Sequence, residues 1–182
     1  MNYSRNISFF IGSAIVYAIF SKINLEFLDA SNAYGANYIW LPAGVRLPIA
    51  MLLGVVGAAG VAVAATFMTL QNGGIENLPN AMAYGLISGF APYLALRSFM
   101  VFLKCEFNLI GLSGKRLLQL TLWSATVHAG LKYIFFLVED PSRNFLESGF
   151  YMALGDCVGT LIILYSIKYS IHFFERLYRL QT

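Results

Sequence analysis

Apolar residues along the chain gather into long runs, and short polar or charged stretches separate these runs. A helix needs about 20 apolar residues to cross the ~30 Å hydrocarbon core of a bilayer, and each run has roughly that length. Charged residues, prolines and glycines mark the ends of the runs. The pattern predicts helices near residues 7–27, 38–54, 56–72, 80–103, 117–138 and 147–171. We therefore expect an all-α, polytopic transmembrane bundle of about six helices with short loops, forming one integral membrane domain over residues 1–182.

The second and third predicted helices have the least distinct boundary. No charged residue lies between Arg46 and Glu76. At a rise of ~1.5 Å per residue this stretch is too long for one comfortable span and short for two. We predict two short helices with a turn near Gly54 to Gly57, and five spans remain the alternative.

Composition agrees with a membrane protein. The chain is 58% hydrophobic and 12% charged, and its mean hydropathy is +0.67, whereas about 25% of the residues in a soluble domain are charged. The two cysteines, Cys105 and Cys157, lack the spacing of a metal site or a disulfide framework. The net charge of +3 is modest and the basic residues lie mainly at helix ends, so no nucleic-acid partner is expected.

The distribution of basic residues predicts the side of the C-terminus. In loops 73–79 and 139–146 the only basic residue is Arg143. Other basic residues follow the fourth helix or lie at the end of the last helix: Lys104, Lys115, Arg116, Lys168, Arg176 and Arg179. By the positive-inside rule the C-terminus is cytoplasmic. Arg5 and Lys22 flank the first helix symmetrically, and an even number of spans would place the N-terminus inside as well.

Four ionisable residues lie inside predicted spans: Arg46, His128, Lys132 and Asp156. Such residues cost several kcal/mol in lipid and normally face a bundle interior, a partner or a water-filled cavity. All four fall about 9 to 15 Å from the outer helix ends, and His128 and Lys132 share one helix face. We expect one polar cluster, either a ligand site or a structural ion pair. A small anionic ligand, or Glu139 from the loop, would balance its excess positive charge.

Small residues and histidines in the spans have simpler explanations than catalysis. Gly85 with Gly89, and Gly155 with Gly159, form GxxxG pairs that favour close helix packing. The first pair does not have the spacing of a nucleophile elbow. His128 and His172 lie at different predicted depths, which disfavours a bis-histidine haem. We expect no enzymatic activity, no cofactor and no metal.

Two motifs carry a family resemblance. Residues 40–47, WLPAGVRL, followed by Leu52-Leu53-Gly54, and residues 154–161, LGDCVGTL, resemble the W-x-P-A-G and G-D-x-x-G-x-L patterns of the membrane-associated sensor domain of the first MASE type. Residues 80–97 resemble the central helix of that family. The resemblance covers positions 38–170, and the residues that carry over are Trp40, Pro42, Gly44, Gly155, Asp156 and Gly159.

The resemblance implies a sensor in the bacterial inner membrane, normally fused through its cytoplasmic C-terminus to a histidine kinase or a cyclic-di-GMP enzyme. The chain departs from the family in three respects. It is shorter than the usual domain, it carries no output domain within its 182 residues, and Leu41 replaces a second proline. We expect a stand-alone sensor-like protein that binds a small ligand or a partner protein.

Proline chemistry adds an expectation about the first motif. Pro42 and Pro48 free backbone groups that lipid cannot satisfy. We expect residues 38–48 to form an irregular, outward-facing helix entrance pinned by Asp156, with Arg46 at its inner lip.

Two other functions compete with sensing. Ala14 and Ala18 form a small-residue pair in the first helix that would dock a coupling subunit if the chain were the substrate-binding S subunit of an energy-coupling-factor importer. An accessory subunit of a larger membrane complex is the other alternative, in which the buried charges are structural.

Overall fold

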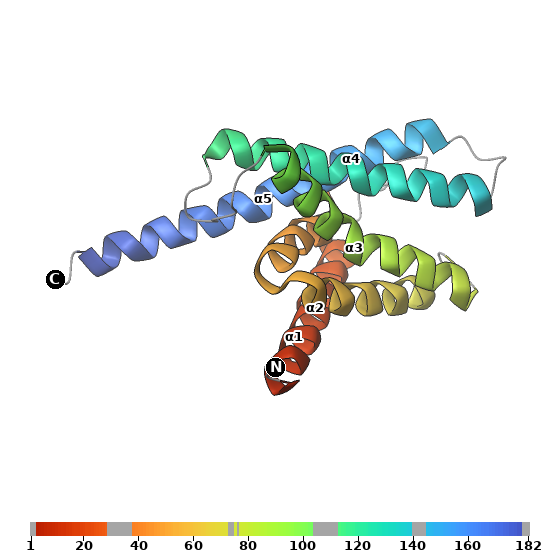
Figure 1. Cartoon of the computed structure of the whole chain (residues 1–182), viewed down its shortest axis with the longest axis horizontal. Coiled ribbons are helices and arrows are strands. Elements are labelled where there is room, and N and C mark those ends of the chain that lie inside the picture. The colour runs from red at the N-terminus through yellow and green to blue at the C-terminus, as the bar shows by residue number, and fades with distance from the viewer. Residues whose placement is uncertain are drawn as a thin grey trace.

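The computed structural model describes residues 3–28, 38–72, 75, 77–103, 113–139 and 145–179. Within these residues the chain forms five helices: α1 (Tyr3–Phe27), α2 (Leu41–Gln71), α3 (Leu78–Leu103), α4 (Gly114–Glu139) and α5 (Phe145–Arg179). The predicted all-helical class is confirmed (Figure 1). Lys104, Cys105 and Arg143 lie outside the described residues, as do the side chains of His172, Arg176 and Arg179.

All five helices are long and apolar enough to cross a membrane. Large hydrophobic side chains cover their outer faces, including Ile15, Leu86 and Leu122, each about half exposed. Lipid is the solvent in which such a surface is favourable, because no bulk water has to be ordered around it. The chain is a multi-pass membrane protein.

The described residues form five helical elements where six helices were predicted. The stretches predicted as separate helices at 38–54 and 56–72 belong to a single element, α2, which is interrupted at Gly54 (φ 57°, ψ −139°). That backbone conformation is essentially confined to glycine, because a Cβ atom would clash with the neighbouring peptide groups. The interruption lies at the start of the segment in which the turn was predicted.

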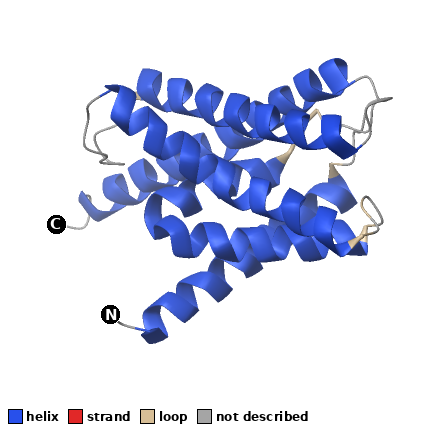
Figure 2. Ribbon diagram, turned by 45° about the vertical axis from the view of Figure 1, so that its right-hand side comes forward, coloured by secondary structure: helices blue, strands red, loops and turns tan. Residues whose placement is uncertain are grey.

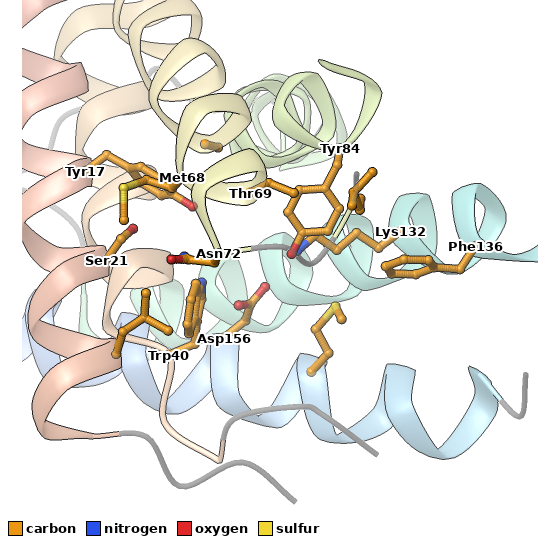
Figure 3. A pocket seen from close by; sticks show the side chains of 14 residues that line it. Tyr17, Ser21, Trp40, Met68, Thr69, Asn72, Tyr84, Lys132, Phe136 and Asp156 are labelled. Carbon is orange, nitrogen blue, oxygen red and sulfur yellow. The ribbon is translucent and has the colours of Figure 1, made fainter. Parts of the chain in front are cut away.

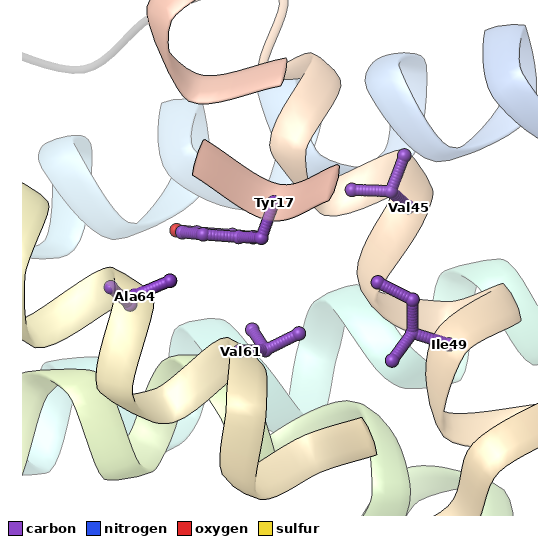
Figure 4. Packing of buried hydrophobic residues seen from close by; sticks show 6 residues of the cluster. Tyr17, Val45, Ile49, Val61 and Ala64 are labelled. Atoms are coloured by element: carbon purple, nitrogen blue, oxygen red, sulfur yellow. The ribbon is translucent and has the colours of Figure 1, made fainter. Parts of the chain in front are cut away.

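The interruption makes α2 fold back on itself. Trp40 directly precedes α2 and Asn72 directly follows it, yet both residues line the same cavity. A straight helix of this length would hold its ends about 46 Å apart. We call residues 41–53 the N-terminal arm and residues 55–71 the C-terminal arm. Val45 and Ile49 of the first arm share a core cluster with Val61 and Ala64 of the second (Figure 4).

The N-terminal arm is the centre of the bundle. Every residue from Pro42 to Ala50 is buried, so this part of the arm has no lipid-facing side, and only Leu52 near the reversal is exposed. One side packs with Tyr17 of α1 and the C-terminal arm. On the other, Leu47 joins a cluster with residues of α3, α4 and α5: Leu96, Phe99, Leu117, Leu120 and Leu164. A helix that contains Pro48 is tolerated at this depth because protein, not lipid, surrounds its backbone.

Glycines allow the closest helix contacts. A Cβ atom at Gly85 would lie 2.6 Å from the Ala62 carbonyl oxygen, and one at Gly89 would lie 2.7 Å from the Ala62 amide nitrogen. This GxxxG pair of α3 is therefore used against the C-terminal arm within one chain, as the packing interpretation predicts.

The helix ends that line the cavity all lie at one end of the bundle. They are the last turns of α1, both ends of α2, the early part of α3, the late part of α4 and the early part of α5. The start of α1 and the end of α5 therefore lie at the opposite end. Figure 2 shows both chain termini on that same side of the molecule.

Candidate functional site

Three buried side chains from three different helices form one bonded cluster. Arg46 of the N-terminal arm places Nη2 3.0 Å from Asp156 Oδ1 of α5. The same guanidinium places Nη1 2.8 Å from His128 Nε2 of α4. His128 Nδ1 is hydrogen-bonded to the other carboxylate oxygen, Oδ2 of Asp156. The three residues are 1 to 3% exposed, so the cluster ties α2, α4 and α5 together in the interior.

The hydrogen-bond donors decide the state of His128. A guanidinium has only donors, so Nε2 of His128 must accept the bond from Arg46. The proton of the neutral ring then lies on Nδ1, from which it is donated to Asp156. Arg46 and ionised Asp156 cancel each other's charge, and the cluster of three residues is neutral as a whole.

Lys132 does not join this cluster, although it lies one turn further along α4. Its Nζ donates to the hydroxyl of Tyr84 in α3 and lies 3.9 Å from the centroid of the Tyr84 ring. The residue is 4% exposed. Glu139, expected as a possible counter-charge, accepts a hydrogen bond from Asn80 at 2.8 Å on the surface. Among the described residues, no carboxylate forms a salt bridge with Lys132.

The two motifs of the sequence resemblance pack against each other. The backbone N–H of Trp40 donates to the Gly155 carbonyl at 3.1 Å. At Gly159, one turn later, a Cβ atom would meet the carbonyl group of Trp40 and the amide nitrogen of Leu41. A Cβ at Gly44 would meet the Gly159 carbonyl in turn. The small residues of both motifs thus bring the start of α2 into backbone contact with α5.

Asp156 holds the predicted helix entrance, residues 38–48, through the side chain of Arg46 and not through the backbone groups at its start. The Trp40 amide is satisfied by Gly155, and the Leu41 amide donates to Asn24 Oδ1 of α1 at 2.7 Å. The chain is already helical at Leu41, and Pro42 falls in the first turn, where an N–H has no intrahelical partner to lose. Asn24 is fully buried and was missed; an asparagine near the end of an apolar helix is the signal that points to it.

A cavity of about 310 Å³ lies beside the cluster. Three residues expected in the site, Trp40, Lys132 and Asp156, line it, whereas Pro42, Arg46 and His128 do not. Its other polar lining comes from residues that the sequence did not single out, namely Tyr17, Ser21, Thr69, Asn72 and Tyr84. The apolar lining is completed by Leu25, Ala65, Met68, Ile75, Phe136 and Met152 (Figure 3). The cavity therefore combines one cation, one carboxylate and several hydroxyl groups with apolar walls.

Metal and thiol chemistry have few candidates in the described part of the chain. It contains no group of three or more His, Cys, Asp or Glu side chains placed to hold a metal ion. Cys157, next to Asp156 on α5, is a free and partly buried cysteine.

The chain was compared with protein-family models, with curated proteins and with solved structures. None of the three comparisons finds a match.

Proposed function

We propose that the protein is a ligand-sensing membrane protein that binds a small molecule in this cavity and reports its occupancy to a partner protein. The observation that carries the proposal is the position of Asp156. Asp156 lines the cavity, and its carboxylate is bonded to Arg46 and His128. A ligand that touches Asp156 therefore acts on the contact that holds α2, α4 and α5 together.

The shape of α5 provides a route from the cavity to the other end of the molecule. This helix has 35 residues and is therefore about 50 Å long. Asp156 lies in its first third, and residues 165 to 170 are all exposed. Figure 1 shows the C-terminal part of α5 projecting beyond the other helices. A rigid helix that moves at Asp156 also moves at its C-terminal end, where a partner would detect it.

The motif resemblance gives the proposal independent support. The residues that resemble the sensor-domain family, including Trp40, Gly44, Gly155 and Gly159, are those that join the start of α2 to α5. In that family the signal is delivered to a histidine kinase or a cyclic-di-GMP enzyme. For this chain we propose a separate protein partner at the cytoplasmic face, and no catalytic step.

The importer alternative receives less support from the packing. Docking of a coupling subunit would require Ala14 of α1 to be available, but Ala14 packs against the chain's own core cluster of Tyr17 and Val61. A purely accessory role gives no account of a cavity lined by Lys132 and Asp156.

Filling the cavity tests the proposal. Thr69 lines the cavity from the C-terminal arm, and a Thr69→Trp side chain would occupy part of its volume. Native mass spectrometry of the protein extracted from its membrane is expected to show a bound small molecule, reduced at least tenfold in Thr69→Trp, which corresponds to about 1.4 kcal/mol. Thr126→Trp, on an exposed face of α4, is the matched control and should retain the molecule. A wild-type protein that is folded and carries no small molecule contradicts the proposal.

We also propose that the protein lies in the bacterial inner membrane with both termini in the cytoplasm. The folded-back α2 supports this placement, because five straight crossings would put the termini on opposite sides. In a variant without native cysteines, we expect Asn77→Cys to react with a membrane-impermeant maleimide in intact cells. Ser4→Cys and Tyr169→Cys, both at exposed positions, should react only after lysis. Labelling of just one terminus from outside would refute the folded-back topology.

A further inference from the structure

We propose that the molecule bound in this cavity is a small organic anion, a carboxylate on an apolar body, whose carboxylate is held by Lys132 and Tyr84. This inference rests on the proposed ligand-binding function and specifies the chemistry of the ligand. It is carried by the charge balance of the buried groups, by the hydrogen-bond donors that face the cavity, and by the cavity's size and walls.

Within the described part of the chain, the buried groups leave one positive charge unmatched when Lys132 is protonated. Arg46 is a cation, Lys132 is a second cation when its amine is protonated, and Asp156 is the single buried carboxylate among the described residues. Both oxygens of Asp156 are already bonded, Oδ1 to Arg46 and Oδ2 to His128. His128 is neutral, because its Nε2 accepts from Arg46. A buried ammonium without a counter-charge is costly, and an anion in the cavity would remove that cost.

The donors at Lys132 match a carboxylate. An ammonium group has three N–H donors, and the hydroxyl of Tyr84 accepts one of them. The hydroxyl proton of Tyr84 remains available as a donor beside the remaining N–H groups of Lys132. Figure 3 shows the ammonium group and the Tyr84 hydroxyl meeting at the cavity. Two adjacent donors of this kind can bind the two oxygens of one carboxylate.

The walls and the volume determine the rest of the ligand. Met68, Phe136 and Met152 supply apolar lining, and methionine side chains adapt to different apolar shapes. A volume of about 310 Å³ holds roughly ten water molecules at ~30 Å³ each. An inorganic anion would leave most of it unfilled, and a whole phospholipid would not fit. A carboxylate with an apolar body of about ten non-hydrogen atoms fits both requirements.

The test compares acids with their neutral amides. Phenylacetate and octanoate represent a compact acid from water and an acyl chain from the membrane, and phenylacetamide and octanamide are their uncharged counterparts. Affinities are measured by calorimetry on the detergent-purified chain after removal of any bound molecule. We expect at least one acid to bind at least tenfold more tightly than its amide, and the molecule released from the untreated protein to be an anion at neutral pH. Which acid is preferred distinguishes the aqueous source from the lipid source.

Two lysine variants test whether Lys132 causes the preference for the acid over its amide. Lys132→Met removes the cavity ammonium and should abolish the difference between acid and amide. Lys115→Met is the matched control, because Lys115 is an exposed residue near the opposite end of α4, and it should leave the difference intact. Tyr84→Phe should reduce the affinity for the acid and leave that for the amide unchanged. The acid-to-amide comparison on the wild-type chain needs no variant, so it is decisive even if Lys132→Met does not fold.

The outcomes separate the ligand chemistry from the proposed function. If acids and amides bind equally and Thr69→Trp abolishes the binding of both, the proposal that the ligand is an anion is overturned. The proposal that the cavity binds a ligand is then retained. A released molecule that is neutral or cationic overturns the anion in the same way. An acid preference that persists in folded Lys132→Met overturns the role of Lys132. If no probe binds and the untreated protein carries no molecule, the ligand-sensing function fails together with the inference.

Discussion

Asp156→Asn is expected to lower the free energy of unfolding by about 3–5 kcal/mol, because it leaves the buried charge of Arg46 without a counter-charge. Asp156 accepts bonds from Arg46 and His128, and all three side chains are buried. The amide that replaces the carboxylate has one acceptor oxygen for two donors. The loss is measured by reversible unfolding in mixed detergent, with retention of helicity as the readout.

A second substitution separates lost charge balance from lost packing. In Arg46→Met with Asp156→Asn no fixed charge is buried in the cluster, and the asparagine oxygen can still accept from His128 Nδ1. The double variant should therefore be more stable than Asp156→Asn alone, with a coupling of about 1–3 kcal/mol. Glu139→Gln, the same type of substitution at an exposed residue bonded to Asn80, should stay within about 0.5 kcal/mol of wild type. An Asp156→Asn protein as stable as the Glu139→Gln control would show that this cluster does not hold the helices together.

Gly159→Ala should destabilise the protein by about 1–3 kcal/mol through overpacking. The added Cβ would lie 3.0 Å from the amide nitrogen of Leu41 and closer still to the carbonyl group of Trp40. These are backbone atoms, and the hydrogen bond from the Trp40 amide to Gly155 restrains them. Trp40 also lines the cavity, so ligand retention should fall together with stability.

Gly130→Ala is the control for this substitution. Gly130 lies inside α4, and nothing is within 4 Å of the position that its Cβ would take. Alanine is a better helix former than glycine by about 1 kcal/mol, so this variant should be as stable as wild type or more stable. Equal stability of Gly159→Ala and Gly130→Ala would contradict the close contact between the two motifs.

The sequence by itself determined the helices and the kind of residue that lies inside. A backbone in lipid must satisfy its own hydrogen bonds, so an apolar run of sufficient length has to be helical whatever surrounds it. The cost of charge in lipid places Arg46, His128, Lys132 and Asp156 away from the acyl chains. Gly54, in a stretch too long for one span, marked the region in which α2 reverses.

Only the tertiary structure decided which buried groups pair. The pairing depends on the depth of each helix in the bundle and on its rotation against its neighbours. The spacing of residues along one helix determines neither the depth nor the rotation. His128 and Lys132 share a face of α4, yet His128 bonds to the cluster of Arg46 and Asp156 while Lys132 bonds to Tyr84. Asn24 caps α2 from 17 residues away. The cavity itself exists because α2 folds back and brings both of its ends to a site that α4 and α5 also line, and no local pattern encodes this approach.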